Sequence, residues 1–88
     1  MAYQFTFTAR FQKHFKTLTS KEKNLITKKL EILAKDPTHP SLRTKQIQGT
    51  DKLFECSVNM DIRIIWYYEN DIMIILVDVG HHDILRRF

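Results

Sequence analysis

Apolar and polar residues divide the second half of the chain into three short strands. The stretch 52–80 holds three apolar runs, at 53–58, 61–69 and 71–79, which Asn and Asp clusters separate. The runs are rich in β-branched and aromatic residues, and no polar segment of helical length lies between them. This pattern predicts an antiparallel meander of three strands.

The first residues alternate between aromatic and polar side chains. This period of two predicts a strand with one buried aromatic face, formed by Tyr3, Phe5 and Phe7. Apolar residues then recur at helical spacing over 11–18, which indicates a short helix that begins near Ala9.

A second helix is expected after Thr19. Thr19 and Glu22 have the spacing of a capping box, in which each side chain bonds the backbone N–H of the other residue. Apolar residues then gather on one side over 25–34, and Asp36 and Pro37 end the helix. We therefore expect the two helices to form a hairpin whose apolar stripe covers the sheet.

The connection at 38–51 shows no clear periodicity and contains Pro40 and Gly49. A structureless connection of this length is usually functional or mobile. Two interpretations stay open, a solvated crossing to the edge of the sheet and a loop that contacts phosphate. The second is suggested by the donors in and beside it, which are His39, Arg43, Lys45 and Lys52.

The loop between the first two strands of the meander has three residues, 59–61. An odd loop of this kind brings like faces of the two strands together. It predicts the cross-strand pairs Val58–Ile62, Ser57–Arg63 and Glu55–Ile65. One face of the sheet then carries the polar group Glu55, Ser57, Arg63 and Tyr67.

The third strand is apolar on both faces over 72–77, which predicts a central position in the sheet. Its second neighbour should be the N-terminal strand, since the meander supplies only one. Gly80 breaks the strand, and a last helical turn is plausible before Phe88.

The composition fits one small domain over 1–88. The chain has 14 basic and 10 acidic residues, a net charge of +4 that favours a polyanionic partner. Its one cysteine, Cys56, lies in an apolar strand and fits a buried, inert thiol in a reducing cytosol. No apolar stretch is long enough to span a membrane, so we expect a cytoplasmic protein.

Several of these side chains suit cleavage of RNA by a ribose 2′-hydroxyl, which requires a base, an acid and a cation near the phosphorus. Arg63 matches phosphate in a forked, charged geometry. His81 or His82 can exchange a proton near neutral pH, and Glu55 is a second candidate base. Phe88 offers a surface on which a nucleobase can stack.

Structural alternatives exist for the same residues. Arg63 could simply pair with Glu55, and the two histidines could be solvated loop residues. Gly80-His81-His82-Asp83 has too few metal ligands at the wrong spacing, so we expect neither a metal site nor a cofactor.

Three segments resemble the RelE/ParE superfamily of toxins from bacterial toxin–antitoxin modules. They read GTDKLF at 49–54, VNMDIRIIW at 58–66 and VDVGHHD at 77–83, and the resemblance covers essentially the whole chain. It implies an α+β fold with an N-terminal strand, a two-helix hairpin over an antiparallel sheet, a three-strand antiparallel meander and a short C-terminal turn or helix. It also implies neutralisation by a partly disordered antitoxin.

The superfamily contains RelE-like members, which cut messenger RNA in the ribosomal decoding site, and ParE-like members, which poison DNA gyrase. Arg63 matches the hairpin arginine of the RNA-cutting members, His82 their C-terminal basic or histidine residue, and Phe88 their terminal aromatic residue. Some members carry lysines at positions 55 and 57, so this chain resembles the histidine and carboxylate version. Phe88 has no hydroxyl, which limits it to stacking.

The resulting hypothesis is a ribosome-dependent endoribonuclease toxin with Arg63, His82 and Glu55 as catalytic residues. The expected substrate-binding residues are Lys45, Ser57, His81 and Phe88. Its expected partners are a cognate antitoxin, with which it could form a hetero-oligomer, and the ribosome with mRNA in the decoding site; no membrane is expected. The alternatives are a gyrase inhibitor without nuclease activity and an inactive relative. Which residue is acid and which is base stays open.

Overall fold

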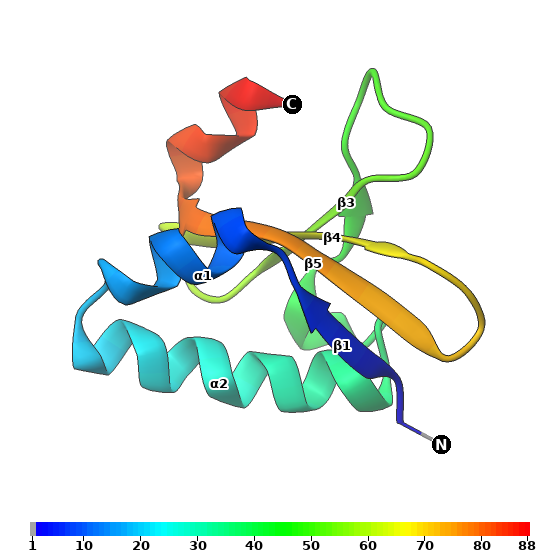
Figure 1. The fold of residues 1–88 in the computed structure, drawn as a ribbon, viewed down its shortest axis with the longest axis horizontal. Helices are drawn as coiled ribbons and strands as arrows, with labels where there is room; N and C mark the ends of the chain where they lie inside the picture. The colour runs from blue at the N-terminus through cyan, green and yellow to red at the C-terminus, as the bar shows by residue number, and fades with distance from the viewer. Residues whose placement is uncertain (1) are drawn as a thin grey trace.

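The computed structural model describes residues 2–88. It contains a five-stranded sheet with two α-helices on one face (Figure 1). The elements in chain order are β1 (Gln4–Phe7), α1 (Ala9–Lys16), α2 (Ser20–Lys35), the 3-10 helix η1 (Pro40–Leu42), β2 (Lys45–Gln46), β3 (Phe54–Ser57), β4 (Ile62–Tyr68), β5 (Met73–His81) and the 3-10 helix η2 (His82–Arg87). The predicted α+β class and element order are confirmed. No helix among the described residues is long and apolar enough to cross a membrane.

Local hydrogen bonds set the helix boundaries. The Thr19 hydroxyl accepts from Glu22 N at 3.1 Å, and the Glu22 carboxylate accepts from Thr19 N at 2.9 Å. The predicted capping box is therefore confirmed. Asp36 ends α2, as expected from the proline that follows it. Thr8 is the N-cap of α1, and its hydroxyl accepts from Phe11 N at 3.1 Å.

The strands lie in the order β1-β5-β4-β3-β2, so β5 is an inner strand with a neighbour on each side, in keeping with its apolar residues on both faces, although the middle strand is β4. The predicted pairing of β3 with β4 is confirmed, since Ser57 lies opposite Arg63 and Glu55 opposite Ile65. A bulge between Ile65 and Trp66 shifts the pairing of β4 with β5. β1 pairs with β5 in parallel, which makes the sheet mixed instead of fully antiparallel.

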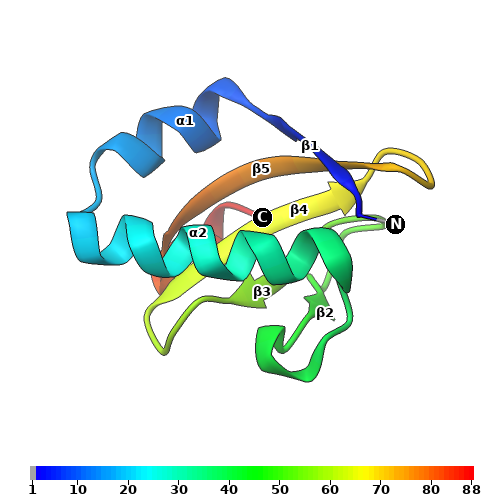
Figure 2. The same ribbon diagram turned by 90° about the horizontal axis from the view of Figure 1, so that it is seen from below.

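Each face of the sheet has its own apolar cluster. On the helix side, residues from α1 and α2 pack over the sheet around the fully buried Trp66. On the opposite face, Ile47, Ile65 and Ile84 form a smaller cluster, with Phe88 against it. In Figure 1, α2 lies below the sheet, whereas the C-terminal segment and the loop before β3 rise above it. Figure 2 shows α2 running across β3 and β4.

Three sequence predictions are wrong at least in part. Gly80 does not break the strand, because β5 continues through it to His81 and pairs there with β4. β1 is a strand, but Phe7 is 42% exposed, because β1 is an edge strand and Phe7 borders an open cavity that Thr27 and Leu30 of α2 also line. The connection at 38–51 is not structureless, since it contains η1 and the two-residue strand β2. Elements this short have no room for a hydrophobic period, so the pattern could not reveal them.

Candidate active site

Arg63 lies on the sheet face opposite the helices, where the β3–β4 hairpin holds its side chain. Its Nη1 donates to the carbonyl oxygens of Asn59 at 2.8 Å and of Ile62 at 3.1 Å. Among residues 2–88, Nη2 donates no hydrogen bond. The hairpin backbone thus fixes the direction of the guanidinium while part of its fork stays available to a ligand.

Glu55 is the carboxylate closest to this guanidinium. Its Oε1 lies 3.7 Å from Arg63 Nε, within ion-pair distance but too far for a good hydrogen bond. Glu55 is 7% exposed, and Lys45 lies across from it in the neighbouring strand β2. The alternative that Arg63 pairs with Glu55 is therefore observed, as a loose pair with acceptor capacity left on Glu55.

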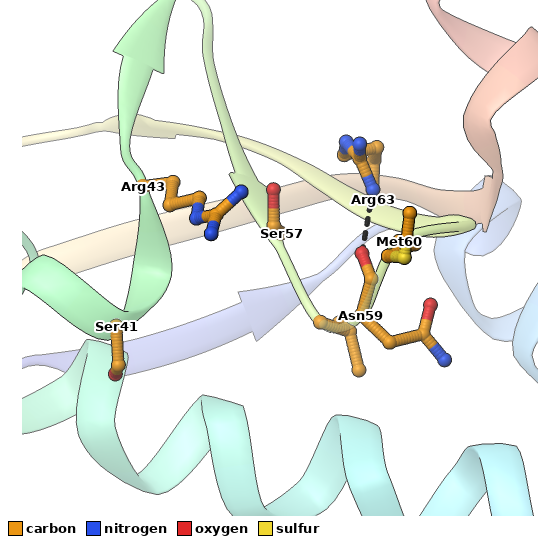
Figure 3. A pocket seen from close by; sticks show the side chains of 7 residues that line it. Ser41, Arg43, Ser57, Asn59, Met60 and Arg63 are labelled. Carbon is orange, nitrogen blue, oxygen red and sulfur yellow. Dashed lines mark hydrogen bonds between the residues drawn. The ribbon is translucent and has the colours of Figure 1, made fainter.

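Two cavities open on this side of the sheet. One, of about 330 Å³, lies between η1 and the β3–β4 hairpin, and Arg43, Ser57 and Arg63 line it together (Figure 3). The other, of about 460 Å³, has Lys45 and Glu55 in its wall. Because Arg63 and Glu55 contact each other but line different cavities, their ion pair lies where the two meet.

Gly80 allows the C-terminal segment to lie against this face. It pairs with Arg63 across β4 and β5, and a Cβ at position 80 would lie only 2.7 Å from Ile84 Cγ2. The missing side chain thus gives Ile84 room to pack on the sheet beside Ile65. As a result, Phe88 lines the same cavity as Lys45 and Glu55.

The two histidines take different positions. His82 begins η2 and is exposed, and its side chain makes no hydrogen bond or ion pair with the described residues. The His81 side chain lies on the helix side, with Nε2 3.6 Å from Glu22 of α2. The structure therefore brings five of the seven predicted residues to one face; His81 lies elsewhere, and His82 lines neither cavity. The five are Arg63, Glu55, Ser57, Lys45 and Phe88.

Arg43 is a cavity residue that the sequence analysis did not include among the candidate site residues. It follows η1, and its side chain extends toward Ser57 (Figure 3). One signal in the sequence pointed to it, the group of hydrogen-bond donors around Arg43. It could not place the side chain, because that depends on a 3-10 turn without a recognisable pattern.

Cys56 is excluded as a nucleophile. Burial raises the pKa of its thiol to about 12, so the reactive thiolate is almost absent at neutral pH. Its side chain lies in the helix-side cluster, away from Arg63. The expectation of a buried, inert thiol agrees with this position.

The face therefore offers a directed guanidinium, a shielded carboxylate, a lysine and an aromatic ring beside two open cavities. Guanidinium donors bind phosphate oxygens, and an aromatic ring stacks on a nucleobase. Among residues 2–88, no three His, Cys, Asp or Glu side chains lie close enough together to bind a metal ion. The arrangement suits an RNA segment that lies across β3 and β4.

Comparisons with solved structures show the fold that this face belongs to. The E. coli DinJ–YafQ toxin–antitoxin complex contains a chain that matches with a TM-score of 0.78 at 16% identity, over 97% of this chain and 98% of that one. The Mycobacterium tuberculosis RelBE2 complex matches with a TM-score of 0.78 at 13% identity, over 93% and 100%. The Pyrococcus horikoshii RelE–RelB complex matches with 0.73 at 17% identity, over 92% and 96%.

At these identities the structures show a common fold alone. No curated protein sequence is significantly similar to this chain. The model of one protein family, described as the bacterial toxin YafQ of type II toxin–antitoxin systems, matches residues 3–87. Since that match covers nearly the whole chain, this protein belongs to the YafQ family of type II toxin–antitoxin toxins.

Proposed function

We propose that this toxin is a ribosome-dependent endoribonuclease that cuts messenger RNA in the decoding site. The observation that carries the proposal is the guanidinium of Arg63. The hairpin carbonyls fix its direction, Glu55 lies beside it, and Nη2 has no partner among residues 2–88. Family membership supports a toxin, and the resemblance of the segment 58–66 to RNA-cutting RelE-like toxins implies this role for Arg63.

In the proposed reaction, the ribose 2′-oxygen attacks the adjacent phosphorus while a base removes its proton. The bond from phosphorus to the 5′-oxygen breaks, and an acid protonates the leaving oxygen. The products are a 2′,3′-cyclic phosphate and a 5′-hydroxyl. Arg63 neutralises the negative charge that grows on the phosphate oxygens in the transition state.

Glu55 and His82 are the proposed proton-transfer groups. Glu55 is close to Arg63 and is almost fully shielded, which suits a carboxylate that acts next to a bound phosphate. His82 is exposed at the start of η2, and its proposed role rests on the resemblance to the RNA-cutting members. The assignment of acid and base between them is left to the pH dependence of single variants.

The remaining residues would hold the substrate. Phe88 would stack on a nucleobase in the cavity that it shares with Lys45. Ser57, opposite Arg63, would donate to a phosphate or a ribose. His81 stays a proposed substrate-binding residue. Because its side chain lies beside Glu22 on the helix side, it would contact only RNA that extends past the face that carries Arg63.

An antitoxin is the second proposed partner. The E. coli YafQ and RelE toxins are solved in complexes with DinJ and RelB, respectively. By analogy we propose that a cognate antitoxin binds this chain in a hetero-oligomer and that both act in the cytoplasm, where mRNA is translated. Co-purification with the product of the neighbouring gene would test this partnership.

The test of the function is cleavage of a defined mRNA on programmed ribosomes. We expect the wild type to cut within the decoding site, and Arg63→Ala and His82→Ala to lower the rate constant by about 100-fold. Arg10→Ala is the matched control, because Arg10 is an exposed arginine on α1. Cleavage by both variants at the wild-type rate would refute the site.

Gyrase poisoning is the competing outcome. The relatives named above are YafQ and RelE toxins, so nothing in the comparisons favours it over RNA cleavage. A wild-type protein that leaves ribosomal mRNA intact but traps gyrase on broken DNA would overturn the proposal. Growth arrest by His82→Ala at the wild-type level would point the same way.

A further inference from the structure

Arg43 is held in a backbone conformation that arginine rarely adopts. Its φ is 51°, and it is the one residue other than glycine with positive φ among residues 2–88. A residue with a Cβ atom destabilises the folded state when its backbone lies in this left-handed region, whereas glycine, which has no Cβ, does not. Such positions persist only where the surroundings enforce them.

The surroundings of Arg43 are well ordered on both sides. Leu42 before it is fully buried, and the His39 Nδ1 accepts from Ser41 N at 3.1 Å, which caps η1. After it, the Thr44 hydroxyl donates to the Pro37 carbonyl at 2.6 Å. The chain is therefore pinned on either side of the strained residue, and this direction sends its side chain toward Ser57 (Figure 3).

The cavity that Arg43 enters is lined by donors. Arg43 and Arg63 contribute two guanidiniums, Ser57 a hydroxyl and Asn59 an amide, whereas the Ser41 hydroxyl lies 2.9 Å from His39 Nδ1. No carboxylate lines it among residues 2–88, and the Glu55 that pairs with Arg63 lines the other cavity. The guanidinium of Arg43 has no ion-pair or hydrogen-bond partner within the same residues. A cavity that two cations share and that no carboxylate lines favours an anionic ligand.

We propose that this cavity binds a second phosphate of the RNA strand, adjacent to the phosphate held by Arg63, and that Arg43 is its main ligand. This deepens the proposed RNA cleavage and rests on it. Arg43 contributes to RNA affinity and to the register of the strand, whereas Arg63 acts on the reacting phosphate. The ligand class is a phosphodiester, because a forked guanidinium and a hydroxyl donor match its two free oxygens.

The test measures binding and cleavage separately. The binding probe is a fluorescent single-stranded 2′-O-methyl RNA dodecamer, which has no free 2′-hydroxyl and stays intact whether or not the toxin is a nuclease. We expect Arg43→Gly to raise Kd about tenfold, the effect of losing one charge-assisted phosphate contact. The slope of log Kd against log salt should fall by about one. On programmed ribosomes, the saturating cleavage rate should stay near wild type.

Two further variants and one probe sharpen the test. Glycine accepts positive φ, so Arg43→Gly should unfold at the wild-type urea midpoint, and Arg43→Lys keeps the charge but loses the fork. Arg10→Ala should bind like wild type. A scan with single neutral methylphosphonates should find one position that weakens wild-type binding and has no further effect on Arg43→Gly.

Specific results would overturn the inference. They are unchanged RNA affinity in Arg43→Gly, an equal loss in Arg10→Ala, or a fall in the saturating rate as large as that of Arg63→Ala. The arms also separate this inference from the function. Intact ribosomal mRNA together with Arg43-dependent binding of the probe would refute the nuclease and keep the phosphate site.

Discussion

Two contacts between a carboxyl group and a basic side chain in this molecule differ in length and in burial. In the first, the fully buried Asp78 of β5 accepts from His14 of α1, with 2.5 Å between Oδ1 and Nδ1. In the second, Glu55 lies 3.7 Å from Arg63, beside two cavities. The short, buried contact, the closed pair, joins a helix to the sheet, which is a structural role. The longer contact, the open pair, leaves donors free, which suits the binding of a ligand.

The environment of each pair explains this difference. The Asp78 Oδ1 also accepts from Val79 N at 2.8 Å, so the backbone and His14 both bond this oxygen, while the buried Oδ2 has no hydrogen-bond partner among residues 2–88. Arg63 instead donates to the carbonyls of its own hairpin, and Glu55 gains only the electrostatic attraction. A ligand phosphate at Arg63 would therefore displace no hydrogen bond between Arg63 and Glu55.

The largest expected effect comes from opening the closed pair. His14→Ala leaves Asp78 buried without its partner, and we expect the free energy of unfolding to fall by about 3 kcal/mol. Urea denaturation measures it. The double variant His14→Ala, Asp78→Asn lacks the buried carboxyl group and should recover part of the lost free energy of unfolding. A fall well below 1 kcal/mol in His14→Ala would show that Asp78 does not depend on His14.

A smaller effect is expected at the segment that borders the open pair. Gly80→Ala places a methyl group 2.7 Å from the Cγ2 of Ile84, so η2 must move. We expect a loss of about 2 kcal/mol in stability from overpacking, together with slower RNA cleavage, because η2 leads to Phe88, which lines the cavity with Glu55. Wild-type cleavage by this variant would show that the site does not need η2 in its present position.

A third variant lies outside both pairs. Thr19→Ala removes the side-chain half of the capping box and should lower the free energy of unfolding by about 1 kcal/mol. We expect the cleavage rate of the folded variant to stay at the wild-type level. A parallel fall in cleavage would mean that stability alone accounts for losses of activity, and the comparison of the two pairs would lose its force.

The smallest effect concerns acid. The hydrogen bond from the Thr19 backbone lowers the pKa of Glu22 below its usual value. A lowered pKa in the folded state gives stability above the unfolded pKa, and this is lost as the pH falls through the folded pKa. Glu22→Gln should therefore remove part of the decline in melting temperature below about pH 4.5. Identical acid profiles would contradict this.

The sequence could predict what depends on local spacing. The three-residue loop and the alternation around it were enough to place Ser57 opposite Arg63 and Glu55 opposite Ile65, and the register is confirmed. Thr19 and Glu22 predicted their own hydrogen bonds for the same reason. Face and register are local properties, and a single chain reveals them.

Contacts between distant residues could not be predicted in this way. His14 and Asp78 are 64 positions apart, and neither has a pattern that points to the other. The left-handed backbone of Arg43 depends on a buried leucine and a 3-10 turn, and the residue type at this position does not predict it. The place of His81 on the helix side follows from where β5 ends relative to Glu22. These parts of the site required the fold.

The most direct test compares one variant of each pair in a single assay. It measures the single-turnover rate constant for cleavage of ribosome-bound mRNA by Arg63→Ala and by the double variant His14→Gln, Asp78→Asn, both under conditions where they are folded. The open pair should be catalytic and the closed pair structural, so we predict a loss of about 100-fold in the first and a rate near wild type in the second. Equal losses in both, or an unchanged rate in Arg63→Ala, would contradict the account.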